Sequence, residues 1–109
     1  MIKYTIHVPH FVADDQGYPT SLPGFNILGE FREGLFKGGI TGLTVLSKNS
    51  FGVWTDGENT IFDHQDILEV VCERKQFEFV VRPLLEMMKV RLNQKSLWVT
   101  AVYVEVVDV

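Results

Sequence analysis

The sequence predicts an α+β fold, a ferredoxin-like plait in which an antiparallel sheet of four to five strands carries two helices on one face. Its 109 residues, 46% of them apolar, are the size of one domain with a real core, and we expect a single domain over 1–109. Segments that alternate apolar and polar residues predict strands, and two segments with apolar residues every three or four positions predict helices. Their order along the chain is that of the plait.

The first part of the chain predicts a strand, a loop and a helix. Apolar residues alternate with polar ones over 2–8, which is the period of a half-buried strand. Residues 10–24 are rich in Gly, Pro, Asp and Ser and predict a long surface loop, and loops of that length are often functional. Apolar residues at helical spacing over 25–36 predict a short helix that ends at Gly38-Gly39.

The middle of the chain predicts a meander followed by a longer helix. Two short strands are expected around 42–47 and 52–55, with a polar turn between them. The hairpin dipeptide Asp56-Gly57 leads toward another alternating segment over 66–74. An apolar stripe over 77–92 predicts the second helix, and Pro83 inside it predicts a kink.

The last strand, expected over 97–107, is apolar on both faces. Two helices cover only one face of a plait, so an apolar second face needs another partner. We therefore predict a homodimer that forms through the sheet. The residues expected on this dimer face are Leu97, Val99, Ala101 and Tyr103.

Charge and composition argue against several classes of function. Ten basic and fourteen acidic residues give a net charge of −4, the wrong sign for coating nucleic acid or an anionic membrane. Cys72 is the only cysteine, so no intramolecular disulfide is possible, and its place on the apolar side of a strand predicts an inert core thiol. The first residues contain no apolar stretch of the length that a signal peptide needs, and no apolar run approaches the roughly 20 residues of a membrane-spanning helix. We expect a cytoplasmic protein without a membrane partner.

Two groups of polar residues are the candidates for chemistry. His7 and His10 precede Asp14 and Asp15, but their spacing matches no metal signature, and we expect neither a metal nor a cofactor. The second group could hold a hard cation or pair a general acid with a base, or it could be a solvated turn beside a strand. This second group comprises Asp56, Glu58, Asp63, His64 and Asp66.

From these groups we select candidate residues for two kinds of site. The acid–base candidates are His7, His64 and Asp63. The candidates for binding a ligand or partner are Trp54, Asp56 and Glu58. Trp54 and Trp98 could each stack a flat ligand, although aromatic residues within strands more commonly belong to the core.

Short motifs between residues 36 and 96 resemble a group of small bacterial and phage proteins. The chain has Gly-Gly-x-Thr at 38–41, Gly-x-Trp at 52–54 and a helix that ends at Gln94 before a long strand. The resemblance covers about residues 25–109. It implies a ferredoxin-like plait and implies no particular activity.

The sequence leaves three functions open. The first, which it favours, is a dimeric binding module that uses the 10–24 loop or the acidic turn to hold a protein or a small molecule. The second is a small enzyme that needs no cofactor and uses a histidine–carboxylate pair. The third is a mobile-element protein whose acidic surface inhibits a host factor. A histidine in a pocket close to a carboxylate would favour the enzyme.

Overall fold

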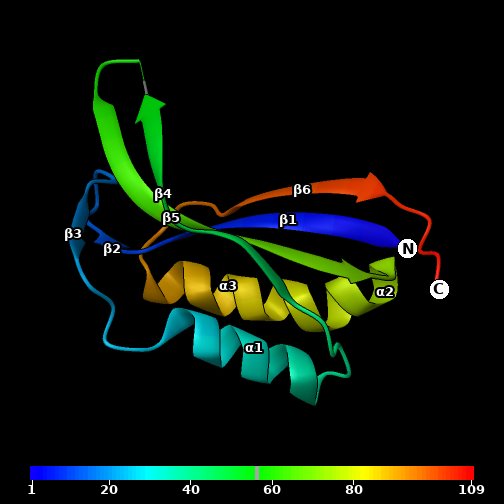
Figure 1. The fold of residues 1–109 in the computed structure, drawn as a ribbon. Helices are drawn as coiled ribbons and strands as arrows, with labels where there is room; N and C mark the ends of the chain where they lie inside the picture. Colours follow the sequence, from blue (N-terminus) through cyan, green and yellow to red (C-terminus); the bar gives the residue numbers. More distant parts are fainter. Residues whose placement is uncertain (56) are drawn as a thin grey trace.

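A computed structural model describes residues 1–55 and 57–109 and has the predicted α+β architecture. Four strands form one antiparallel sheet in the order β4-β5-β1-β6. Two helical segments lie beneath it, as Figure 1 shows, and both cover the same face. The four strands of the sheet are β1 (Ile2–Pro9), β4 (Thr44–Thr55), β5 (Thr60–Cys72) and β6 (Trp98–Tyr103).

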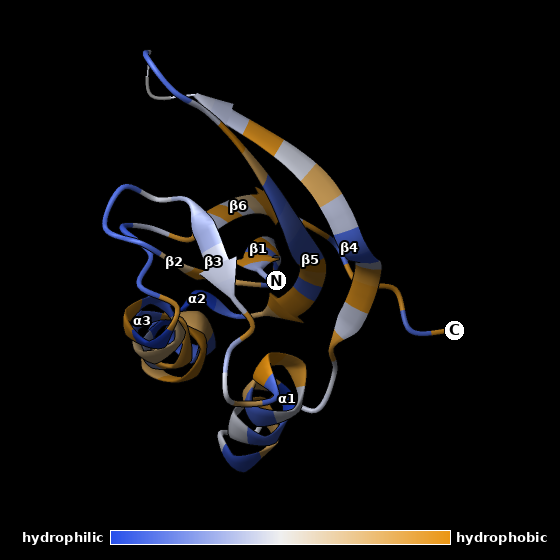
Figure 2. Ribbon diagram, turned by 90° about the vertical axis from the view of Figure 1, so that its left-hand side faces the viewer, coloured by the Kyte–Doolittle hydropathy of each residue, from blue (hydrophilic) through white to orange (hydrophobic). Residues whose placement is uncertain are grey.

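The core lies between this sheet and the helices (Figure 2). The alternation predicted for the first strand is confirmed, because every second residue of β1, beginning with Ile2, is buried. β5 contributes buried residues in the same way, and Cys72 is among them, as the sequence predicts. Burial raises the pKa of the Cys72 thiol, which keeps it protonated and unreactive.

Helix α1 (Ile27–Lys37) begins two residues later than predicted and ends, as predicted, at Gly38-Gly39. The backbone N–H of Gly29 donates to the side chain of Asn26 over 2.9 Å, which caps the first turn. After the last turn, Gly39 takes a φ of +88°, a conformation that glycine adopts without strain. Phe31 and Leu35 point from α1 into the core.

The second helical segment is continuous and contains a π-helical turn just before Pro83, the residue at which the sequence predicts a kink. It comprises α2 (Arg74–Gln76), the π-helix η1 (Phe77–Val81) and α3 (Arg82–Arg91). Pro83 follows this π-helical turn directly, in a helical backbone that continues from Val81 through Arg82. The wider π turn therefore accommodates a proline that would break a regular α-helix.

The two short strands expected around 42–47 and 52–55 are one strand, β4. Residues 48–50 do not form a turn but a β-bulge, at which the register with β5 shifts and Asn49 takes a φ of 58°. Bulges bend a strand and increase its twist. The β4–β5 hairpin accordingly rises away from the helices and leans over the open face of the sheet (Figures 1 and 2).

The prediction that the last strand presents a dimer face is wrong, because the residues predicted for that face lie on the side of the sheet that the helices cover. The register pairs Val99 with Ile6 and Tyr103 with Ile2, so these side chains share the side of the buried residues of β1. Leu97 and Val99 pack against the core. The strand also ends at Tyr103 and not at residue 107. Ala101, the remaining residue of the predicted dimer face, pairs with Tyr4 and lies on the same side of the sheet.

The 10–24 loop contains a small β-hairpin and is tied to the domain. β2 (Val12–Ala13) pairs with β3 (Pro19–Ser21). The Asp14 side chain accepts hydrogen bonds from the backbone N–H groups of Gln16 and Tyr18, both over 2.9 Å. Within the described ranges, no helix is both long enough and apolar enough to cross a membrane.

Candidate small-molecule site

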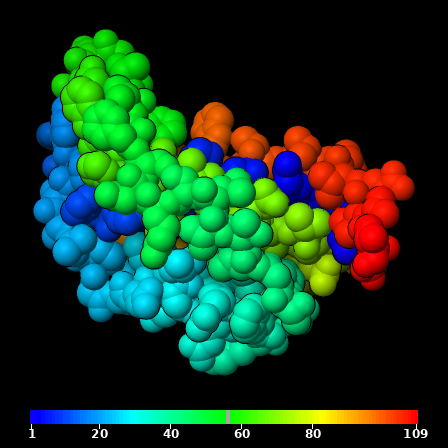
Figure 3. All heavy atoms as spheres, in the orientation of Figure 1, coloured from blue at the N-terminus to red at the C-terminus, as the bar shows by residue number. Residues whose placement is uncertain are grey.

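A cavity of about 450 Å³ opens on the face of the sheet that the helices leave bare. Volumes of this size are typical of sites for small ligands. The projecting hairpin stands beside it, as the space-filling view in Figure 3 shows. All four strands of the sheet contribute to the walls, and the segments 14–17 and 93–97 close one end. The strand residues that line the cavity are His7, Pro9, Trp54, Ile61, Asp63, Gln65 and Trp98.

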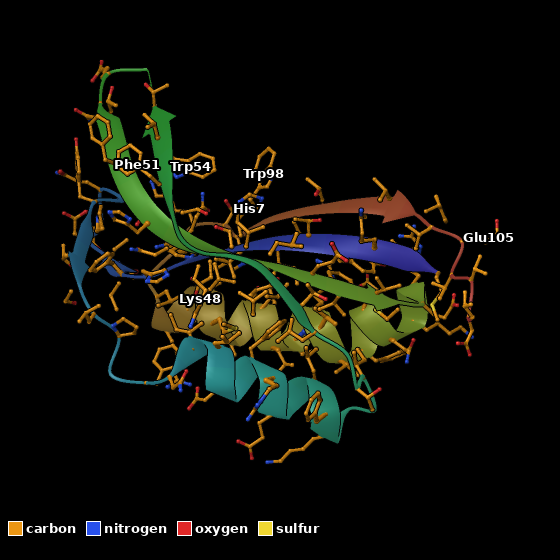
Figure 4. The ribbon with its side chains drawn as sticks, in the orientation of Figure 1. His7, Lys48, Phe51, Trp54, Trp98 and Glu105 are labelled. Atoms are coloured by element: carbon orange, nitrogen blue, oxygen red, sulfur yellow. The ribbon has the colours of Figure 1, made fainter. Side chains whose placement is uncertain are left out.

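The two tryptophans come from opposite edges of the sheet and meet at this cavity. Trp54 lies on β4 and Trp98 on β6, three strand spacings apart, which is about 14 Å in a flat sheet. Their ring centroids are only 6.4 Å apart, with 47° between the ring planes. The bend of the β4–β5 hairpin closes this distance, and Figure 4 shows both rings pointing into the same space. Both are exposed, by 42% and 58%, so their faces are accessible to a ligand.

Asp63 is the acidic group with the most altered environment in the cavity. Burial raises the pKa of its carboxyl group. A 2.8 Å hydrogen bond from the backbone N–H of His64, together with the nearby imidazoles of His64 and His10, partly opposes that rise in pKa. A carboxyl group with a raised pKa keeps its proton to a higher pH than a free aspartate, and its carboxylate is the stronger base.

His7 lines the same cavity and extends from the strand at the centre of the sheet. Its Nδ1 atom is buried and has no hydrogen-bond partner among the described residues. Buried polar atoms without partners are uncommon in folded proteins. His7 is therefore a second group in this cavity that can bind or exchange a proton with a ligand.

One asparagine joins the two segments that close the cavity. Asn93 ends the second helical segment with a φ of 50°. Its side-chain amide donates to the Ala13 carbonyl over 2.9 Å and to the Asp15 carboxylate over 3.3 Å. Asp14, Asp15 and Asp63 all line the cavity, whereas Lys95 is its only lysine or arginine within the described part of the chain. The cavity therefore favours a cationic ligand.

The remaining predicted site residues lie elsewhere. Because side chains alternate along a strand, His64 faces away from the neighbouring Asp63 and packs edge-on against Phe51, 5.7 Å between centroids. Glu58 is exposed near the end of the hairpin and does not line the cavity, and Asp56 lies outside the described residues. The structure thus brings together only His7, Asp63 and Trp54 from the predicted set, with Trp98 beside them.

His10 and Asp66 form a separate pair on the side of the helices. His10 Nε2 lies 2.6 Å from Asp66 Oδ1, and the backbone N–H of Asn49 donates to the same oxygen over 3.0 Å. This pair joins the start of the 10–24 loop to β5 and the bulge, so its role is structural. In the described ranges, no three His, Cys, Asp or Glu side chains are arranged to hold a metal ion.

Gln65 is a buried polar residue of the cavity that the sequence analysis did not select. It alternates with Ile61 and Asp63 on β5, so all three share the open face. We expected a strand only from residue 66, which hid this alternation. A strand that begins at Thr60 would have placed Asp63 and Gln65 side by side with Ile61.

The fold is similar to that of a solved enzyme. No family model and no curated protein sequence matches the chain. A solved structure titled as a phage SAM lyase in complex with S-methyl-5′-thioadenosine superposes with a TM-score of 0.60 and 15% sequence identity. The similarity covers 92% of this chain and 78% of the lyase chain. It supports the α+β fold and, at this identity, nothing finer.

Proposed function

We propose that this chain binds an adenine nucleoside with a sulfur substituent at its 5′ carbon, and that it acts as a lyase on S-adenosylmethionine. The proposal rests on the cavity, which is lined by two neighbouring tryptophans and by the partly buried carboxyl group of Asp63. The similarity in fold to a SAM lyase that holds S-methyl-5′-thioadenosine supports this ligand class.

The tryptophans would bind the base. An exposed indole face stacks on any purine, and each such contact contributes about 1–3 kcal/mol to binding. Trp54 and Trp98 offer two indole faces at one opening. A flat aromatic ligand is therefore a better fit to this cavity than a sugar or an aliphatic acid.

The acidic groups would select the sulfonium form of the ligand. S-Adenosylmethionine carries a positive charge on sulfur, which the carboxylates of Asp14, Asp15 and Asp63 attract. When a general base removes a proton from the carbon next to the sulfur-bound carbon of the four-carbon chain, the C–H electron pair forms a carbon–carbon double bond and the electron pair of the carbon–sulfur bond passes to sulfur. The four-carbon chain leaves as an unsaturated amino acid, and the sulfur becomes a neutral thioether. The cavity then holds S-methyl-5′-thioadenosine, which it attracts less, so charge favours substrate entry and product release.

Asp63 and His7 are the two groups best placed to exchange a proton with the ligand. The raised pKa of Asp63 makes its carboxylate a stronger base than a free aspartate. His7 has an unpaired buried nitrogen among the described residues and lies beneath Trp98 (Figure 4). This proposal is a variant of the enzyme that the sequence left open, with His7 and not His64 as the histidine. His7 pairs with Ile67 in the sheet, four residues along β5 from Asp63, so the two groups would act on the ligand separately and not as a hydrogen-bonded pair.

Turnover and binding can be measured together. We expect the protein to release S-methyl-5′-thioadenosine from S-adenosylmethionine faster than protein-free buffer does, measured by liquid chromatography. Replacing Trp98 by alanine should weaken binding of the thioether by about 1–3 kcal/mol in calorimetry. Phe51→Ala is the matched control, because Phe51 is an exposed aromatic residue on the other face of the hairpin. A wild-type chain that neither binds the thioether nor accelerates its release contradicts the proposal.

We also propose that two copies of the chain associate, through residues other than those the sequence indicated. The outer face of the projecting hairpin exposes a cluster of Phe51, Val53 and Phe62, and the two phenylalanine rings stack with centroids 5.7 Å apart. Exposed apolar clusters of this kind commonly mark interaction surfaces. Sedimentation equilibrium at micromolar concentration should show a dimer that Phe62→Asp converts to a monomer. A monomeric wild-type chain would refute this association.

A further inference from the structure

We infer that Gln65 recognises the 6-amino group of adenine in the tryptophan cavity, an inference that rests on the proposed nucleoside-binding function. Gln65 is only 8% exposed and is the one polar or charged residue in the buried class among the described residues. It nevertheless lines the cavity. A buried amide that borders a ligand-sized space is placed to contact whatever fills that space.

The amide of Gln65 has no partner within the described part of the protein. No hydrogen bond joins its side chain to another described residue, whereas Gln94, which also lines the cavity, bonds to the Leu92 carbonyl over 3.5 Å. Both the donor and the acceptor of this amide are therefore available to a ligand in the cavity. A ligand that supplies both an acceptor and a donor would pair with them.

A glycine holds this amide beside the tryptophan. A Cβ atom on Gly52 would lie 2.9 Å from Gln65 Nε2 and 3.3 Å from Trp54 Nε1. The Gln65 amide and the indole N–H of Trp54 therefore both lie over Gly52, where any side chain would displace them. The amide thus borders the same part of the cavity as Trp54.

The edge of adenine matches a carboxamide. Its 6-amino group donates a hydrogen bond and the adjacent ring nitrogen accepts one, and the amide of Gln or Asn satisfies both together. Such a bidentate pair discriminates between bases by about 1–3 kcal/mol, or roughly 5- to 150-fold in affinity. Gln65 would then set the choice of base, while the tryptophans accept any purine.

The test compares two ligands and three proteins by calorimetry. The ligands are S-methyl-5′-thioadenosine and the same thioether nucleoside with hydrogen in place of its 6-amino group. The wild-type chain should bind the first at least about fivefold more tightly. Gln65→Leu should bind the two equally. Gln16→Leu is the matched control, because Gln16 lines the same cavity from an exposed loop, and it should keep the preference.

The possible outcomes distinguish a failure of this inference from a failure of the proposed nucleoside-binding function. If the wild-type chain binds both nucleosides with equal affinity, Gln65 does not read the amino group, although nucleoside binding stands. The inference is equally overturned if Gln65→Leu keeps the preference. If the wild-type chain binds neither nucleoside, the proposed function fails and the inference fails with it. Thermal melting checks the folding of each variant, and the wild-type comparison remains decisive even if Gln65→Leu unfolds.

Discussion

The two faces of the sheet are built from the same strands and have opposite properties. On the face that the helices cover, β1 and β5 present closely packed apolar side chains such as Ile6 and Leu68, which are fully buried. On the open face, the alternate positions of these strands carry His7, Asp63 and Gln65 around a cavity. One face therefore supplies stability, and the other holds polar groups that cost stability and can bind a ligand.

The largest expected effect is on the covered face. Phe31→Ala removes a fully buried ring of α1 and should lower the free energy of unfolding by about 3–5 kcal/mol. Phe36→Ala removes an equal ring from the same helix at a half-exposed position and should cost far less. Urea unfolding measures both. Equal losses for the two variants would mean that α1 does not pack against the sheet as described.

A smaller effect is expected where the two helical segments touch. Gly34 packs directly on the Leu84 side chain, so the Cβ of Gly34→Ala would overlap it. We expect a loss of about 1–3 kcal/mol in the free energy of unfolding. Gly42→Ala is the control, because nothing lies within 4 Å of its added Cβ. A Gly34→Ala variant as stable as Gly42→Ala would contradict this close approach.

On the open face, the same kind of substitution should separate stability from activity. Burial raises the pKa of Asp63 in the folded chain, so the folded state holds this proton more tightly than the unfolded state. The resulting stabilisation is complete at acid pH and is lost as the pH rises through the raised pKa. Asp63→Asn keeps a hydrogen-bond acceptor and removes the buried charge.

Asp63→Asn should therefore melt at a temperature equal to or above that of the wild type at neutral pH. This difference in melting temperature should shrink toward acid pH. Turnover of S-adenosylmethionine should fall roughly 100-fold or more if Asp63 exchanges a proton with the ligand. If Asp63→Asn melts at a lower temperature than the wild type at neutral pH, or keeps full turnover, then Asp63 does not have the proposed role in the site.

The sequence predicted the fold well because period and order determine it. The alternation in β1 and the apolar stripes of the helices each required only local information. The strands that were misjudged contain bends: the polar residues 48–50 lie in a bulge of β4 and not in a turn. A bulge and a turn use the same residue types, so composition alone does not separate them.

The candidate site could be predicted only in part, because it depends on tertiary geometry. His7, Asp63 and Trp54 were identified by residue type, but His64 was included although it is adjacent to Asp63 and faces the other way. The meeting of Trp54 with Trp98 follows from the bend of the hairpin over two intervening strands. No local pattern in the sequence encodes that distance.

The central claim is that the tryptophan cavity binds an adenine thioether nucleoside, and tryptophan fluorescence tests it most directly. The chain has two tryptophans and both line the cavity, so their emission reports on this site alone. Titration with S-methyl-5′-thioadenosine should change the emission in a saturable way, whereas methionine, which lacks the base, should not. Emission that stays constant up to millimolar nucleoside would contradict the account.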